Sequence, residues 1–358
     1  MVSEKRFDFI DYIKVIACFS VIAVHVRLNL MSAIPASAFG MKSKLFFAFD
    51  YQLFISCVPL FLMCTGFLMI NKKYDGKYIL SLIKTYGIYV VCSIMTAILF
   101  FSVIGTPIIL KEVVYKIFTF KEISYSWYVE MYLGLGMLIP MLNKIIKDCT
   151  KKQLKTGVAV LVMVIAIPKF VNSVGPINRY IILPAYWTGF YPIIYYLLGA
   201  YFRLYQLEVE RVKKQFVLLG YLGMVALGIM INIFNSSPYV GDSEGGYASI
   251  LIVAQSALLF LLIMQNMPRG NSVIRMISKI TLPIYLMSNF VDLVLYPKYI
   301  QYFGGAKGVI KMFIVIVIAH FLLSFILAFI ADKINQLVFN IIFKRYKKHE
   351  NPTVITTP

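Results

Sequence analysis

The 358-residue chain is poor in charged residues. Only 14% of its residues are charged and 60% are hydrophobic, whereas a soluble globular domain carries about 25% charged residues. Of the charged residues 16 are acidic and 35 are basic, which gives a net charge of +19. The basic residues lie in short loops between long apolar runs. This placement indicates membrane topology and contact with anionic headgroups, and we expect no nucleic-acid partner.

Histidine and paired cysteine are also scarce. The three histidines are His25, His320 and His349. The five cysteines form no CxxC motif and no Cys/His spacing that would suit a metal, so neither a disulfide framework nor a metal site is predicted. They are Cys18, Cys57, Cys64, Cys92 and Cys149.

Apolar runs long enough to cross a bilayer as helices recur along the whole chain. We expect ten of them, at about 8–30, 45–70, 78–103, 127–146, 154–170, 188–206, 214–234, 247–265, 280–296 and 307–334. The sequence therefore predicts an all-α integral membrane protein, a bundle of about ten transmembrane helices. Residues 1–348 are expected to form a single transmembrane domain, and 349–358 a short cytoplasmic tail.

The distribution of lysine and arginine predicts the orientation. With the N-terminus in the cytoplasm, 24 of the 35 basic residues fall on the cytoplasmic side and 11 on the outer side. Short cytoplasmic loops carry an excess of Lys and Arg. We therefore expect both termini in the cytoplasm, an even number of spans, and a multi-pass protein of the cell membrane.

The first apolar segment carries three ionisable residues, Asp11, Lys14 and His25. On a helix, Lys14 and His25 lie three turns apart on one face, about 16 Å along the axis. Ionisable residues inside a span are costly and indicate function. We take all three as candidate catalytic residues. The alternative is an Asp11–Lys14 ion pair at the cytoplasmic headgroups, with His25 at the far interface.

Four lysines in the cytoplasmic loop 71–84 are candidates for holding the phosphates of a cofactor or substrate as point charges. They are Lys72, Lys73, Lys77 and Lys84. The positive-inside bias explains the same residues without a ligand, and that alternative stays open.

Both tryptophans fall at the outer interface. Trp127 begins the fourth span and Trp187 the sixth, with Glu130 and Arg179 nearby. An aromatic belt explains the tryptophans simply. A sugar-binding platform would use the same four residues, the tryptophans for stacking and Glu130 and Arg179 for the hydroxyls.

Three residues inside other spans also stand out. Pro59 and Pro283 are predicted to break their helices, and such breaks often line cavities. His320 lies mid-membrane in the last span. A hydrogen bond to a neighbouring helix is the simpler interpretation of His320, and a relay role stays open.

Several stretches, in order, resemble the membrane-bound acyltransferase-3 family, the O-acyltransferases of surface polysaccharides and peptidoglycan. From Arg6 to about Asn289 they read RFDFIDYIKVIACFSVIAVH, VPLFLMCTGFLM, SWYVEMYLGLGMLIPMLN, YYLLGAYFR and SKITLPIYLMSNF. Three features depart from the family pattern. Lys14 stands where the family usually has arginine, and lysines around Lys72 to Lys84 stand where it has an arginine pair after the second span. Asn289 ends a segment that often ends in histidine.

The resemblance implies a membrane O-acyltransferase with His25 as its essential residue. The donor would be cytoplasmic acyl-CoA, with acetyl-CoA expected, and the acceptor a hydroxyl of a cell-surface polysaccharide or its lipid-linked precursor. His25 would act as a general base or carry the acyl group transiently. A transporter or flippase without acyl chemistry, and a membrane anchor or sensing module, are the competing functions.

Overall fold

The structure is a computed structural model that describes residues 6–33, 40–174, 185–234, 246–266, 269–303 and 306–349. Every regular element in these ranges is a helix, which confirms the predicted all-α class. In chain order they are α1 (Asp8–Ala33), α2 (Met41–Phe54), α3 (Cys57–Met69), α4 (Gly76–Ile104), α5 (Leu110–Phe118), η2 (Ser124–Ser126), α6 (Trp127–Asp148), α7 (Lys151–Leu161), η3 (Val162–Ala166), α8 (Ile167–Ser173), η5 (Ala185–Phe190), α9 (Tyr191–Leu204), α10 (Gln206–Val209), α11 (Lys214–Phe234), η6 (Gly246–Ala248), α12 (Ile250–Asn266), α13 (Ser272–Lys279), α14 (Thr281–Tyr302) and α15 (Ala306–His349).

Each of the ten predicted spans overlaps a helix, but fewer are long enough to cross a membrane on their own. Among the described residues seven helical stretches qualify by length and composition, and the bent pair α13–α14 would add an eighth. The other two predicted spans correspond to α9 and α12, with 14 and 17 residues. The apolar runs there continue into η5 and η6, so the sequence overstated the length of regular helix. The chain is thus a multi-pass helical protein.

Two helix breaks occur where the prolines predicted them. The first break lies between α2 and α3, at Ile55 and Ser56. Pro59 lies in the first turn of α3. α13 and α14 meet at an angle of 68°, and Pro283 lies in the first turn of α14. A proline is tolerated in a first turn because its missing N–H has no partner there anyway. The start of α14, directly after the second break, lines a cavity.

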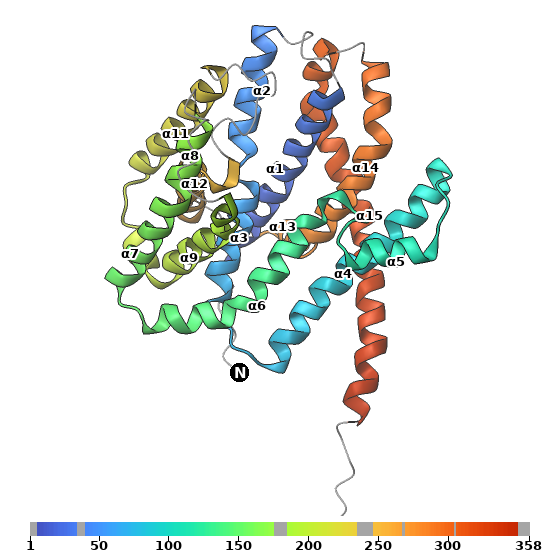
Figure 1. Ribbon diagram of the computed structural model, residues 1–358, viewed down its shortest axis with the longest axis horizontal. Coiled ribbons are helices and arrows are strands. Elements are labelled where there is room, and N and C mark those ends of the chain that lie inside the picture. Colours follow the sequence, from blue (N-terminus) through green and yellow to red (C-terminus); the bar gives the residue numbers. More distant parts are fainter. Residues whose placement is uncertain are drawn as a thin grey trace, which may run out of the picture.

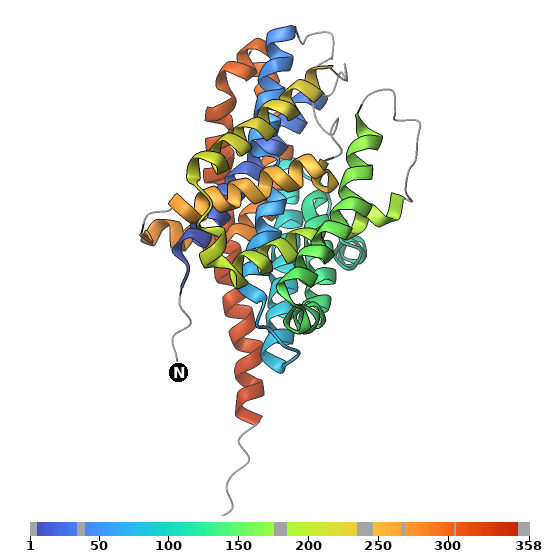
Figure 2. The ribbon, with the colours of Figure 1, turned by 90° about the vertical axis from the view of Figure 1, so that its left-hand side faces the viewer.

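α1 runs through the middle of the bundle (Figure 1). It packs against α2, α3, α12, α13, α14 and α15. The charged residues of α1 therefore lie among other helices and away from lipid. The last part of α15 extends beyond the other helices in both ribbon views (Figure 2).

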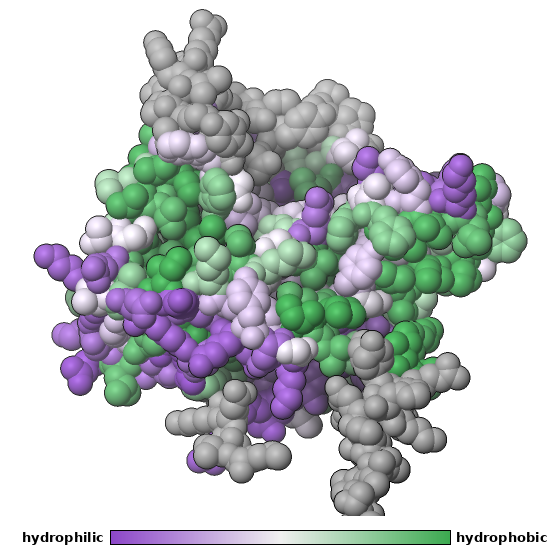
Figure 3. Space-filling view, turned by 60° about the horizontal axis from the view of Figure 1, so that its bottom comes forward, coloured by the Kyte–Doolittle hydropathy of each residue, from purple (hydrophilic) through white to green (hydrophobic). Residues whose placement is uncertain are grey.

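Hydrophilic residues gather at one end of the molecule. Figure 3 turns the lower end of Figure 1 forward and shows them at lower left, while hydrophobic residues cover much of the rest. The α6–α7 connection lies on this side in Figure 1 and carries several of the lysines assigned to the cytoplasm. They are Lys144, Lys147, Lys151, Lys152 and Lys155. A polar end next to an apolar flank fits a protein embedded in a membrane.

The closest helix pair is α3–α9, where two glycines let the backbones approach. A Cβ on Gly66 would lie 2.0 Å from the carbonyl oxygen of Tyr196, and a Cβ on Gly199 would lie 2.1 Å from that of Met63. Small residues at such crossings are the usual means of close packing in membranes.

We expect Gly66→Ala to destabilise the protein by about 1–3 kcal/mol, because the added methyl group would force α3 and α9 apart. The measurement is thermal unfolding of the purified protein in detergent. Gly134→Ala is the matched control, since a Cβ on Gly134 would meet nothing within 4 Å. Equal melting temperatures for the two variants would contradict the close α3–α9 packing.

Candidate functional site

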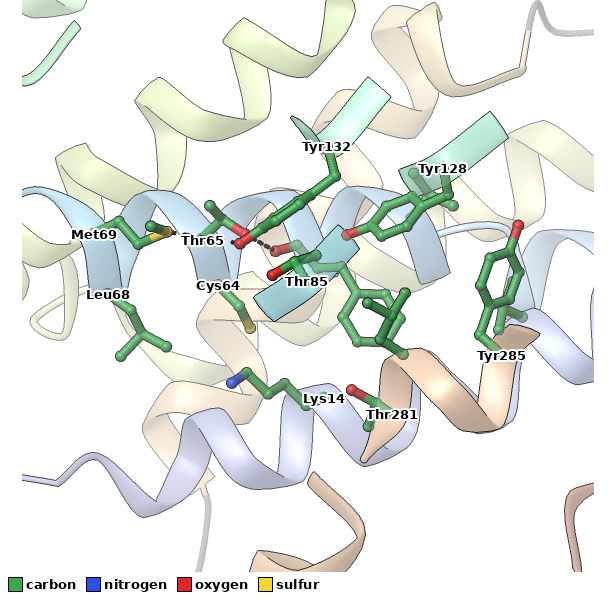
Figure 4. Close-up of a pocket in the computed structure, with 14 residues that line it drawn as sticks. Lys14, Cys64, Thr65, Leu68, Met69, Thr85, Tyr128, Tyr132, Thr281 and Tyr285 are labelled. Carbon is green, nitrogen blue, oxygen red and sulfur yellow. Dashed lines mark hydrogen bonds between the residues drawn. The ribbon is translucent and has the colours of Figure 1, made fainter. Parts of the chain in front are cut away.

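A cavity of about 290 Å³ lies between α1, α3, α4, α6 and α14 (Figure 4). Its lining combines apolar side chains with an ammonium, a thiol and several hydroxyls. The lining residues are Lys14, Val21, Val58, Phe61, Cys64, Thr65, Leu68, Met69, Thr85, Tyr128, Tyr132, Thr281, Leu282 and Tyr285. Mostly apolar walls with a few polar groups are typical of a small-molecule site.

Lys14 is the charged residue of this cavity. Its side chain extends from α1 toward Cys64 of α3 (Figure 4). No described residue forms a hydrogen bond or ion pair with its ammonium group. An unpaired cation is expensive inside a membrane bundle. The Lys14 ammonium is therefore available to a ligand that carries negative charge or a polarised carbonyl.

The deep end of the cavity reaches the surroundings of His25. Val21, one turn before His25 on α1, lines the cavity together with Tyr285 of α14. The Tyr285 ring centroid lies 5.9 Å from that of His25. Lys14 and Tyr285 thus line the cavity, and the His25 imidazole, which does not line it, lies next to the Tyr285 ring.

His25 packs against an aromatic ring. Its ring centroid lies 3.7 Å from that of Tyr125, with the planes tilted by 34°. The side chain is half-buried, and no described residue forms a hydrogen bond with either ring nitrogen. Both nitrogens are free to bind a substrate group.

Asp11 belongs to a different cluster, at the start of α1. Its carboxylate accepts hydrogen bonds from Arg6 Nη2 at 2.6 Å and from Ser278 Oγ at 2.5 Å. Asp8 forms a second link to the same helix through Arg275 Nη2 at 2.9 Å. These bonds fasten α1 to α13, and the Asp11–Lys14 ion pair of the alternative interpretation is not formed. Asp11 is therefore held by α13 and is not among the residues that line the cavity.

The four candidate phosphate-binding lysines are exposed around the α3–α4 connection. Asn143 of α6 donates to the carbonyl oxygens of Met69 at 2.7 Å and Lys72 at 2.8 Å, which fixes this turn. Asp75 then caps α4 by accepting from the Tyr78 N–H at 2.7 Å. Met69 lines the cavity, so the lysine-bearing turn lies next to the cavity's Lys14 end.

The candidate acceptor residues lie on two elements. Trp127 begins α6 and stacks on Tyr247, which in turn stacks on Tyr191 of α9. Trp187 lies in η5, one turn before Tyr191. Glu130 is exposed on α6, and Arg179 lies outside the described residues. The structure links the Trp127 stack to the start of α9.

Sequence reasoning missed the polar groups behind His25. Asp292 of α14 is 1% exposed. One of its oxygens lies 2.6 Å from His320 Nδ1, and the other accepts from the Tyr125 hydroxyl at 2.5 Å. The predicted bond from His320 to a neighbouring helix is confirmed. The sequence did carry one signal for these groups. Asp292 lies in the ninth predicted span, where a carboxylate is costly unless it has a partner.

A comparison with protein-family profiles decides the family. The profile described as an acyltransferase domain matches residues 7–333. The chain belongs to the acyltransferase-3 family. No curated protein matches the chain, and no solved structure does. The match extends from α1 into α15 and covers every residue that lines the cavity of this acyltransferase.

The groups of this acyltransferase suit acyl transfer by acid–base chemistry. A histidine without a hydrogen bond can take the proton of an attacking hydroxyl. The cavity wall carries hydrogen-bond donors as well, among them the Lys14 ammonium and the hydroxyls of Thr281 and Tyr128. No three metal-binding side chains gather in the part of the chain that the structure describes.

Proposed function

We propose that the protein is an integral-membrane O-acyltransferase of the cell membrane. It moves an acyl group, expected to be acetyl, from cytoplasmic acyl-CoA to a hydroxyl of a cell-surface polysaccharide or its lipid-linked precursor. The observation that carries the proposal is the cavity, which runs from the Lys14 ammonium to the Tyr285 ring beside His25. A long thin thioester can lie along such a path, and the mostly apolar lining suits a pantetheine arm better than a hydrophilic glycan.

In the donor half of the reaction, acyl-CoA enters from the cytoplasmic side. The exposed lysines of the α3–α4 connection attract its phosphates: Lys72, Lys73, Lys77 and Lys84. The pantetheine arm lies in the cavity, where Lys14 supplies a positive charge near the arm or the thioester. The acyl group then lies at the Tyr285 end.

In the acceptor half, the hydroxyl approaches from the outer side. His25 takes the hydroxyl proton as the oxygen attacks the thioester carbonyl, a C–O bond forms, and the C–S bond breaks. The imidazolium returns the proton to the CoA thiolate, so charge and protons balance. Transient acylation of His25 would use the same positions in two steps. Trp127 and Trp187 offer stacking surfaces to the sugar, with Glu130 and Arg179 for its hydroxyls.

The orientation that this route needs is ten spans with both termini in the cytoplasm. Cysteines introduced in 144–155 should react with a membrane-impermeant maleimide only from the cytoplasmic side, and those in 235–246 only from outside. The physical reason is the excess of Lys and Arg in the first group and their absence from the second. Labelling of both groups from one side would exclude this topology.

The function is tested by mass spectrometry of surface polysaccharide from cells with and without the protein. We expect an ester-linked acyl group that disappears when the protein is absent, while the amount of polysaccharide stays constant. A flippase would give the opposite pattern, with no acyl group in either strain and less surface polysaccharide in the strain without the protein.

A further inference from the structure

A buried chain of three polar side chains lies behind His25. It joins η2, α14 and α15 through Tyr125, Asp292 and His320, which are 8%, 1% and 0% exposed. Both oxygens of Asp292 are engaged, one by the Tyr125 hydroxyl at 2.5 Å and one by His320 Nδ1 at 2.6 Å. A carboxylate and an imidazole inside a membrane bundle are costly. Packing alone would be served better by apolar side chains of similar size.

The chain ends on the proposed catalytic residue. The Tyr125 ring is the one packed against the His25 imidazole, with centroids 3.7 Å apart. A catalytic histidine is commonly oriented by a carboxylate that binds its second ring nitrogen. Here the carboxylate binds a tyrosine instead, and the tyrosine contacts the imidazole through its ring.

Tyr125 is fixed at further points. Asn29 Nδ2 donates to the Tyr125 hydroxyl at 3.3 Å and to the backbone carbonyl of His25 at 2.8 Å. The Tyr285 hydroxyl donates to the carbonyl oxygen of Tyr125 at 2.7 Å. The hydroxyl of Tyr125 thus has both a donor and an acceptor, and its ring has little freedom to move away from His25.

We infer that Asp292 and His320 are positioning residues that anchor Tyr125, and that the anchored Tyr125 ring fixes the orientation of the His25 imidazole. This inference rests on the proposed function, because the orientation matters when His25 acts on a bound acyl group. It leaves both ring nitrogens free, which a direct carboxylate bond would not. Asp292 and His320 influence the reaction through Tyr125 and touch no substrate.

The kinetic test compares variants that remove or keep the anchor. Asp292→Ala should lower kcat about 10- to 100-fold, because a displaced catalytic group loses rate steeply. Asp292→Asn should recover most of the rate, since an amide can still accept from Tyr125 and pair with His320. Tyr125→Leu should lower kcat more than Tyr125→Phe, which keeps the ring. The KM for acyl-CoA should stay unchanged in all four.

The matched control is Tyr299→Phe. The Tyr299 ring also lies against His320, at 5.5 Å between centroids, but it has no contact with Tyr125 or His25 in the structure. The variant makes the same chemical change as Tyr125→Phe on the other side of His320, and we expect wild-type kcat. A fall in kcat as large as that of Asp292→Ala would overturn the inference.

A second measurement does not depend on activity. Diethyl pyrocarbonate modifies exposed imidazole nitrogens, and peptide mass spectrometry separates His25 from the other histidines. In Tyr125→Leu and Asp292→Ala the His25 imidazole is no longer held against an anchored Tyr125 ring, so its rate of modification should change several-fold. In Asp292→Asn and Tyr299→Phe that rate should stay at the wild-type value. Thermal unfolding of each variant identifies any that fails to fold.

The two measurements separate the two claims. If the wild-type protein transfers no acyl group, the proposed function fails, and the modification rates still decide whether Asp292 and Tyr125 hold His25. Unchanged modification of His25 in folded Asp292→Ala and Tyr125→Leu would overturn the positioning role, even if acyl transfer is confirmed. Lower kcat together with altered modification, both restored in Asp292→Asn, is the result expected.

Discussion

His25→Ala should abolish most acyl transfer while leaving expression and membrane insertion intact. Loss of a general base typically costs about 10²- to 10⁴-fold in rate, so a small residual activity is expected. The side chain is half-buried and forms no hydrogen bond with a described residue. Its removal therefore leaves no buried polar partner unpaired. The measurement is transfer of labelled acyl groups by purified protein, with thermal unfolding to show that the variant is folded.

The other two histidines serve as controls for this result. His320→Ala should lower the rate much less, since it removes one of several anchors of Tyr125, and His349→Ala should have no effect at the far end of α15. Wild-type transfer by folded His25→Ala would rule out the mechanism proposed for His25. No transfer by wild-type protein, with surface polysaccharide lost in the variant, would favour a flippase.

Helical periodicity was enough to predict the fold and the helix that carries Lys14 and His25. Apolar runs identify spans because a helix in lipid must present apolar side chains for about 20 residues. The same periodicity places Lys14 and His25 on one face of α1. It could not give the length of α9 or α12, because η5 and η6 carry no charged residue that would mark the end of an apolar run.

The partners of the site residues could not be predicted from spacing. Tyr125 and Asp292 are 167 positions apart, and Asp11 and Ser278 are 267 apart. Such pairs exist only after the helices have packed, so they leave no periodic signal. Asp11 shows the consequence. Its spacing to Lys14 left an ion pair within α1 open as an alternative, whereas packing brings Arg6 and α13 to its carboxylate instead.

Lys14→Met should raise the KM for acyl-CoA about 10- to 100-fold, the second largest effect that the structure predicts. Hydrogen bonds to charged groups contribute about 1.5–3 kcal/mol, and 1.4 kcal/mol corresponds to a factor of ten. The Lys14 ammonium faces the cavity without a partner among the described residues. Its interaction energy is therefore available to the donor. The measurement is steady-state kinetics over a range of acyl-CoA concentrations.

Two further variants separate charge at the cavity from charge at the surface. Lys14→Arg keeps the positive charge and restores the residue usual in the family, so its KM should stay within a few-fold of wild type.

The triple replacement of Lys72, Lys73 and Lys77 by Ala should raise the KM for acyl-CoA in dilute buffer. The difference from wild type should shrink at high salt, because those lysines are exposed and salt screens exposed charges. The Lys14→Met effect should persist better at high salt, because Lys14 is half-buried and buried charges are screened less. An unchanged KM in Lys14→Met would show that the donor does not occupy this cavity.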